Sequence, residues 1–193
     1  MVPNETGPPL MPKLPAIARR LAGSRIVRDE RGVTAIEFGL LALPFFALLG
    51  AILETSLVFL GAQVLDAAVY DASRQIRTGQ AQQARMTADG FRSLVCTRLY
   101  GLFDCSGLRV NVSVVEGGFG GVNVPPPVET TCTTTCDWAE DESFVPGQGQ
   151  QIVLVRVYYK WPTMLNIGGF GLADQPDGTR LMAGVEVFRN EPF

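Results

Sequence analysis

The chain has 193 residues, a formal net charge of −3 and no histidine. This length fits one domain of ordinary size with an appendage, and the hydrophobic content of 47% is ordinary for a folded protein. The lack of histidine removes the commonest general base and metal ligand, and the acidic balance of residues 33–193 opposes nucleic-acid binding.

The first 32 residues predict a basic leader without regular structure. The segment MVPNETGPPLMPKLPAIARRLAG is rich in proline and glycine, and residues 1–32 carry a net charge of +3 against −6 for the remainder. The basic residues of this leader are Lys13, Arg19, Arg20, Arg25, Arg28 and Arg31. Because positive charge beside a membrane span favours the cytoplasmic side, we expect the N-terminus inside and the C-terminal part outside.

A membrane-spanning helix is predicted next. Between Phe38 and Leu65 the only ionisable side chain is Glu54, and about 20 apolar residues of helix suffice to cross the bilayer core. A cleaved secretory signal is an alternative, but its apolar run is shorter than this one and an A-x-A cleavage site is missing. Because helical spacing of apolar residues continues beyond the apolar run, we expect one helix over residues 33–78, stopped at Gly79.

Four cysteines follow the span: Cys96, Cys105, Cys132 and Cys136. An even number on the exported side favours disulfides, for which three pairings exist, and proximity in the sequence favours Cys96 with Cys105 and Cys132 with Cys136. Reduced buried thiols are the alternative, whereas zinc is disfavoured because neither spacing fits a finger and no histidine is present. The segment TADGFRSLVCTRLYGLF predicts a short helix. Its apolar face comprises Phe91, Leu94, Val95, Leu99 and Leu102.

Beyond Ser106 the hydrophobic period changes to two, which predicts β-strands. The strands are expected in LRVNVSVVE, QIVLVRVYYKW and RLMAGVEVF, with loops rich in glycine and proline between them. In the first strand Leu108, Val110, Val112 and Val114 share a face; in the second Val153, Val155, Val157, Tyr159 and Trp161; in the third Leu181, Ala183, Val185 and Val187. An antiparallel meander covered by short helices follows, and the predicted fold class is α+β, with a long N-terminal transmembrane helix ahead of this small domain.

The usual catalytic motifs are missing from the sequence. No phosphate-binding glycine loop, nucleophile elbow or dinucleotide fingerprint is present. The acidic run DWAEDES lacks the spacing of a calcium loop and is interpreted as a solvated loop. Tyr158, Tyr159 and Trp161 have strand spacing, which is more typical of packing than of a ligand face. We therefore expect a non-enzymatic protein without cofactor, metal, nucleic acid or small-molecule substrate.

The start of the apolar helix carries the most informative pattern. Gly32 precedes it, Glu37 is the fifth residue after that glycine, and Phe38 follows. This arrangement resembles the processing region of type IV pilin-like proteins, in which a membrane peptidase cuts after the glycine. The resemblance implies that Val33 becomes a new N-terminus, and that its ammonium pairs with Glu37 of a neighbouring subunit. The alternative is that Gly32 only starts the helix and that Glu37 is an interfacial carboxylate, stabilised by the helix dipole near the N-terminus.

A longer stretch narrows the resemblance. The sequence RGVTAIEFGLLALPFFALLGAILETSLVFLGAQVLDAAVYDASRQIRTG looks like the TadE-like family, pseudopilins of the tight-adherence (Tad, type IVc) pilus system. The segments VCTRLYGLFDCSGLRV, QIVLVRVYYKWP and GTRLMAGVEVFRNEPF extend the likeness over most of residues 31–193. The likeness implies a prepilin peptidase, other pilin-like subunits and the Tad assembly machinery as partners, in an inner membrane with the C-terminal domain in the periplasm.

These observations predict a minor pseudopilin with three parts: a cleaved leader over 1–32, a transmembrane and amphipathic helix over 33–78, and a periplasmic domain over 79–193. Glu54, toward the outer leaflet, is expected to make a polar contact with a partner helix, although protonation or snorkelling would also accommodate it. The alternatives are an unprocessed single-span protein whose outer domain binds another envelope component, and a membrane-tethered enzyme. Whether the protein enters the filament or only primes assembly is left open.

Overall fold

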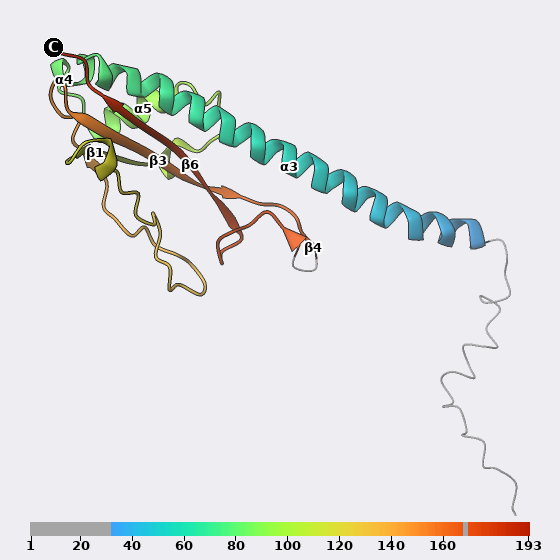
Figure 1. Ribbon diagram of the computed structural model, residues 1–193. Helices are drawn as coiled ribbons and strands as arrows, with labels where there is room; N and C mark the ends of the chain where they lie inside the picture. The colour runs from blue at the N-terminus through green and yellow to red at the C-terminus, as the bar shows by residue number, and fades with distance from the viewer. Residues whose placement is uncertain (1–31, 168–169) are drawn as a thin grey trace, which may run out of the picture. The chain divides into compact units, whose positions relative to one another are not determined.

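The computed structural model describes residues 32–167 and 170–193 (Figure 1). The basic leader predicted for residues 1–31 lies outside them. The described part is α+β, with a long N-terminal helix, short helices and a small sheet. The helices are α3 (Val33–Arg77), α4 (Gln80–Gln83) and α5 (Ala88–Cys96), with short 3-10 turns at Cys105–Gly107 and Phe119–Gly121. The strands are β1 (Arg109–Val115), β2 (Ser143–Phe144), β3 (Ile152–Pro162), β4 (Asn166–Ile167), β5 (Phe170–Gly171) and β6 (Thr179–Arg189).

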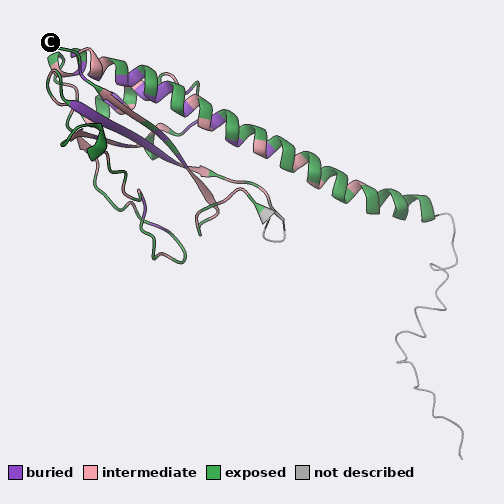
Figure 2. Ribbon diagram, in the orientation of Figure 1, coloured by how far each residue is buried: buried purple, intermediate pink, exposed green. Residues whose placement is uncertain are grey.

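The helix α3 has 45 residues and contains Pro44. From Leu49 onward α3 belongs to one compact unit, which comprises residues 49–193. Within this unit one face of α3 is buried, at intervals of three and four residues, as a helix packed on a sheet requires. The buried positions are Glu54, Val58, Gly61, Leu65, Ala68, Val69, Ala72, Ser73 and Ile76 (Figure 2). Gly79 follows the helix in the left-handed conformation (φ 79°), as predicted for a stop residue.

The second helix is shorter than predicted. It was expected over residues 87–103, but α5 ends at Cys96, and Tyr100 and Gly101 adopt positive φ angles of 52° and 76° that no α-helix accommodates. Thr87 caps its N-terminus by accepting a hydrogen bond from the N–H of Gly90. Because the helical phase is lost, Leu102 is 40% exposed instead of lying on the apolar face, and Phe103 is buried in its place.

The three long strands form the predicted antiparallel meander, in the order β1-β3-β6. Val112 of β1 pairs with Val155 of β3, and Val157 of β3 pairs with Gly184 of β6. The sheet as a whole is mixed rather than antiparallel, because the two-residue strand β2 adds to β1 in parallel. The short hairpin of β4 and β5 was also expected as loop. Strands of two residues carry no period that a sequence pattern reveals.

The core lies between α3, α5 and one face of the sheet. Two glycines allow the close approach of α3 to the strands. A Cβ on Gly184 of β6 would lie 2.7 Å from Cγ2 of Val69, and one on Gly61 would lie 3.2 Å from the Trp161 ring. The face of β6 that packs inward therefore holds Met182 and Gly184. The predicted face, with Ala183 and Val185, is the wrong one: both of these residues are exposed.

A long connection between β1 and β3 covers the opposite face of the sheet. The Trp138 ring lies under the guanidinium of Arg109 and the ammonium of Lys160, at 5.6 and 4.9 Å from its centroid. Arg156, only 5% exposed, donates hydrogen bonds to Asn111 (2.8 Å) and Glu140 (3.1 Å). The acidic run expected as a solvated loop is thus partly folded onto the sheet, because Arg156 and other cations of the sheet face it.

The tip of this connection is closed on itself. Val128 and Trp138 form an antiparallel bridge, and beyond it Cys132 and Cys136 form a disulfide across four positions. Cys136 is buried, whereas the three threonines at 133–135 are exposed. The stem of the loop, at Val128 and Trp138, is therefore held against the sheet, and its tip is closed by the disulfide.

Candidate functional site

The predicted processing residues lie where α3 begins. Gly32 forms a single 3-10 position ahead of the helix and is exposed, and Val33, the first residue of α3, is 44% exposed. Glu37 and Phe38 lie on the helix one turn further along, both exposed. Within residues 32–167 and 170–193, Glu37 makes no ion pair. The backbone at Gly32 and the carboxylate of Glu37 are both accessible from solution or lipid.

The surface of α3 around these residues is apolar. The most hydrophobic window of the helix has a mean hydropathy of 2.2, with none of its residues buried, and its exposed aliphatic and aromatic side chains continue from Val33 to Leu60. Figure 2 shows the N-terminal part of α3 as mostly exposed. The helix is long and apolar enough to span a membrane, and an exposed surface of this kind is stable in lipid or against other apolar helices.

Glu54 was expected to find its partner on another helix, but the described residues supply donors from its own chain. Its carboxylate, 6% exposed, accepts hydrogen bonds from the N–H of Met164 and the N–H of Leu165, the latter at 3.1 Å from each oxygen. These two residues follow β3 and are more than 100 positions away in the chain. Two backbone donors to one carboxylate offset its desolvation without a counter-charge.

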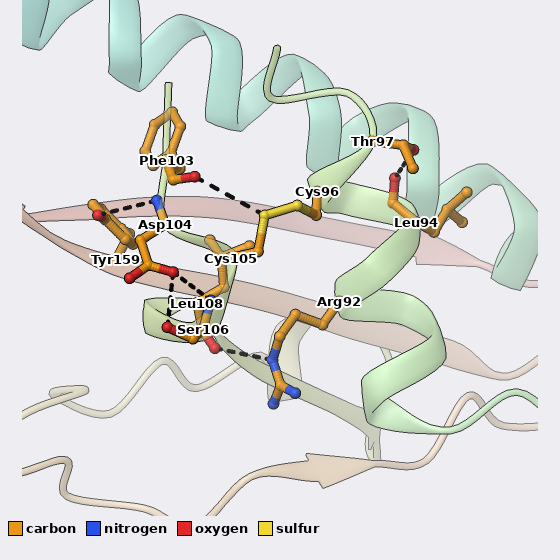
Figure 3. The surroundings of a disulfide bond; sticks show 10 residues. All are labelled: Arg92, Leu94, Cys96, Thr97, Phe103, Asp104, Cys105, Ser106, Leu108 and Tyr159. Atoms are coloured by element: carbon orange, nitrogen blue, oxygen red, sulfur yellow. Dashed lines mark hydrogen bonds between the residues drawn. A yellow bond between two sulfur atoms is a disulfide. The ribbon is translucent and has the colours of Figure 1, made fainter. Parts of the chain in front are cut away.

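The cysteines form two disulfides, Cys96–Cys105 and Cys132–Cys136, which are the pairs that sequence proximity favoured. The first joins the end of α5 to the 3-10 turn ahead of β1 (Figure 3). Beside it the Asp104 carboxylate accepts hydrogen bonds from the hydroxyl and the N–H of Ser106, and these bonds lower the pKa of Asp104. This arrangement braces α5 against the sheet.

A partly buried ion pair connects the acidic run to α5. Arg92 binds Glu142 at 2.5 Å, and Glu142 also accepts from the N–H of Val110 at 2.9 Å. Burial alone raises the pKa of Glu142, but the bonds from Arg92 and Val110 outweigh it, so that the pKa lies below its ordinary value of 4.5. No pattern in the sequence predicts this contact, since Arg92 and Glu142 are 50 positions apart and neither belongs to a motif.

The family model of TadE-like proteins matches residues 32–74. This segment is TadE-like. The match begins at Gly32 and includes Glu37, Phe38 and Glu54. It ends within α3, so the segments of the sheet domain that resemble the same family lie outside the match. No curated protein and no solved structure matches the chain.

The TadE-like match confirms the family resemblance over the long helix. It indicates a membrane component associated with the Tad pilus, and TadE-like proteins are structural or assembly components of that pilus. Association with other Tad pilus components follows from the same match. The apolar helix α3 is the element that can anchor such a component in a membrane.

Proposed function

We propose that this protein is a minor pseudopilin of a Tad-type pilus, held in the inner membrane by the apolar part of α3, with residues 79–193 in the periplasm. The observation that carries the proposal is the TadE-like match, which starts at Gly32 and runs along an exposed apolar helix. The net charge of +3 on residues 1–32 supports a cytoplasmic N-terminus.

Processing is the first part of the proposal. A prepilin peptidase removes residues 1–32 by cutting the bond between Gly32 and Val33. The exposure of both residues at the very start of α3 supports access to that bond. Glycine also leaves the backbone free of a side chain, so that an enzyme can approach it closely. Cleavage creates an ammonium at the N-terminal end of α3.

Register between subunits is the second part. Glu37 of one subunit pairs with the Val33 ammonium of its neighbour, and Phe38 packs beside this pair. An unpaired ion in lipid costs roughly several kcal/mol in lost hydration, and pairing the two charges offsets this cost for both. Only one axial offset of the two helices satisfies both charges, which sets their register. Because Glu54 is bonded within its own chain, its contribution to assembly is indirect, through the domain that it holds.

The test of processing is the intact mass and N-terminal sequence of the protein purified from native membranes. We expect a chain that begins at Val33, and a full-length chain for Gly32→Leu. Gly39→Leu is the matched control, since a Cβ at either glycine meets no atom within 4 Å. A wild-type chain that retains residues 1–32 in cells with an active peptidase would instead favour an unprocessed, membrane-tethered binding protein.

The test of register is Glu37→Gln, which keeps the size of the side chain and removes its charge. We expect normal processing and membrane insertion but loss of crosslinks between this protein and other pilin-like subunits. Removing one partner of a buried pair costs about 3–5 kcal/mol, so contacts should weaken by at least about a hundredfold. Unchanged crosslinking of the Glu37→Gln protein would rule out the ion pair as the source of register.

A further inference from the structure

The loop that follows β3 is joined to α3 at two adjacent levels. At the upper level the Glu54 carboxylate accepts the N–H groups of Met164 and Leu165. One helical turn nearer the N-terminus, the side chain of Leu165 packs on Gly50, where a Cβ would lie 3.1 Å from its Cδ1. The loop therefore reaches down α3 as far as Gly50.

Gly50 lies too near the start of α3 to be clear of a bilayer that this helix spans. At 1.5 Å per residue, roughly 26 Å of helix separate Val33 from Gly50, whereas the hydrocarbon core is about 30 Å thick. In the uncleaved chain the core cannot be placed nearer the N-terminus, because Arg28 and Arg31 precede Val33 and charged side chains resist entry into hydrocarbon. Tilt of the helix would bring still more residues into the core. The level of Gly50 and Leu165 is therefore inside the leaflet nearest the sheet domain.

The surface around this loop has the composition that such a position requires. Three side chains from three separate elements expose apolar area there: Leu57 on α3 (43%), Leu102 after α5 (40%) and Met164 in the loop (76%). Together with Trp161 and Pro162 they border a pocket of about 180 Å³. Among the described residues that line it, Glu54 is the only charged one, and the loop already satisfies that carboxylate.

We infer that this rim, defined as Leu57, Leu102, Trp161, Pro162 and Met164, is a second membrane contact at the headgroup boundary of the domain-side leaflet, since roughly 36 Å of helix separate Val33 from Leu57. Phospholipid acyl chains and their glycerol ends fill the pocket. Trp161 then lies near the polar boundary, where indole rings are enriched in membrane proteins. The rim is continuous with the lipid-facing surface of α3, which is why lipid is its occupant. It fixes how deep α3 sits in the membrane. The inference rests on the membrane anchoring of the proposed function.

Tryptophan fluorescence in vesicles with dibrominated phosphatidylcholines tests this contact, because bromine quenches only indoles that contact the labelled depth. The chain has two tryptophans, so Trp138→Phe with Trp161→Phe gives a silent full-length background. In it, Met164→Trp reports the rim. Val124→Trp is the control, at an exposed residue in the long β1–β3 connection. Phe46→Trp reports the middle of the span, where the side chain faces outward from α3.

We expect the Met164→Trp protein to lose fluorescence with lipids brominated near the headgroup, to an extent comparable with the loss at Phe46→Trp for lipids brominated near the bilayer centre. The Val124→Trp protein should stay unquenched. Quenching at position 46 without quenching at 164 would overturn the inference and leave the membrane anchor intact. If the unquenched signal at 164 is also blue-shifted, protein and not lipid covers the rim. Absence of quenching at position 46 would instead overturn the membrane anchoring itself.

Discussion

Removing the Glu54 carboxylate should release the loop that follows β3. In Glu54→Ala the N–H groups of Met164 and Leu165 lose their common acceptor, on a face of α3 where Glu54 itself is only 6% exposed. In Glu54→Gln one oxygen remains at the same place and can accept from both N–H groups, but without the charge that strengthens the two bonds. The two variants therefore separate the loss of the acceptor from the loss of the charge.

The expected magnitude follows from the two donors. Each buried N–H left without an acceptor costs about 1–3 kcal/mol. Because the loop lies at the polar boundary of the bilayer, its released N–H groups can turn toward water and headgroups. We therefore take the lower end for each and expect about 2 kcal/mol for Glu54→Ala. That corresponds to about 30-fold faster opening of the loop, at about 1.4 kcal/mol for each factor of ten. For Glu54→Gln we expect roughly fivefold, since only the charge assistance is lost.

Amide hydrogen exchange at Met164 and Leu165, measured on the full chain in lipid nanodiscs, reads out this opening directly. Glu116→Ala is the control, because Glu116 is exposed in the turn after β1 and should leave exchange at both amides unchanged. Equal protection of the two amides in the wild type and in Glu54→Ala would refute the reasoning. The loop would then be held by the packing of Leu165 on Gly50, and not by the carboxylate.

Three further predictions concern the sheet domain. Gly184→Ala should lower the free energy of unfolding by about 1–3 kcal/mol through overpacking against Val69, and Val69→Ala in the same chain should restore part of the loss, as measured by denaturant unfolding. The pKa of Glu142 is lowered, so its contribution to stability is present above its ordinary pKa of 4.5 and is lost as the pH falls below that value; Glu142→Gln should flatten this acid-side decline in Tm. Replacing Cys96 and Cys105 by serine should cost about 2.7 kcal/mol, from the entropy of a loop of about ten residues.

Each of these predictions has a matched control. Gly120→Ala adds a Cβ that meets no atom within 4 Å, so equal destabilisation by Gly120→Ala and Gly184→Ala would contradict the overpacking argument. Glu129→Gln removes an exposed carboxylate, and a flattened pH profile in that variant would show that general charge causes the decline. Removal of Cys132 and Cys136 should destabilise less, since its closed loop is shorter and mostly exposed; the reverse order would contradict the loop-entropy estimate.

Local patterns in the sequence were sufficient to predict the long helix, its stop at Gly79 and the three long strands, and they favoured the disulfide pairs that form. Each of these depends on residues that are close in the chain or that repeat with a fixed period. The inward face of β6 could not be found this way, because Gly184 contributes to packing by having no side chain, and a hydrophobic pattern does not register it. The early end of α5 could not be predicted either, because nothing in the sequence indicates that Tyr100 adopts a positive φ angle.

In the candidate site, too, the residues close together in the chain could be predicted and the distant contacts could not. Gly32, Val33, Glu37 and Phe38 form a short local motif, which a sequence displays directly. The partners of Glu54 are two backbone N–H groups over 100 positions away, and backbone groups are identical in every residue. No pattern of side chains predicts these two donors, and another helix was therefore the partner expected for Glu54.

The disulfide between Cys132 and Cys136 separates three exposed threonines, residues 133–135, from the rest of the domain. Below it, the bridge between Val128 and Trp138 already fixes the stem, so the stability of the fold does not depend on what the closed loop contains. Substitutions and short insertions there are expected to be free to accumulate among related proteins. The same position is therefore the natural place for an epitope tag or an affinity label, at the point of the described domain where a foreign sequence disturbs folding least.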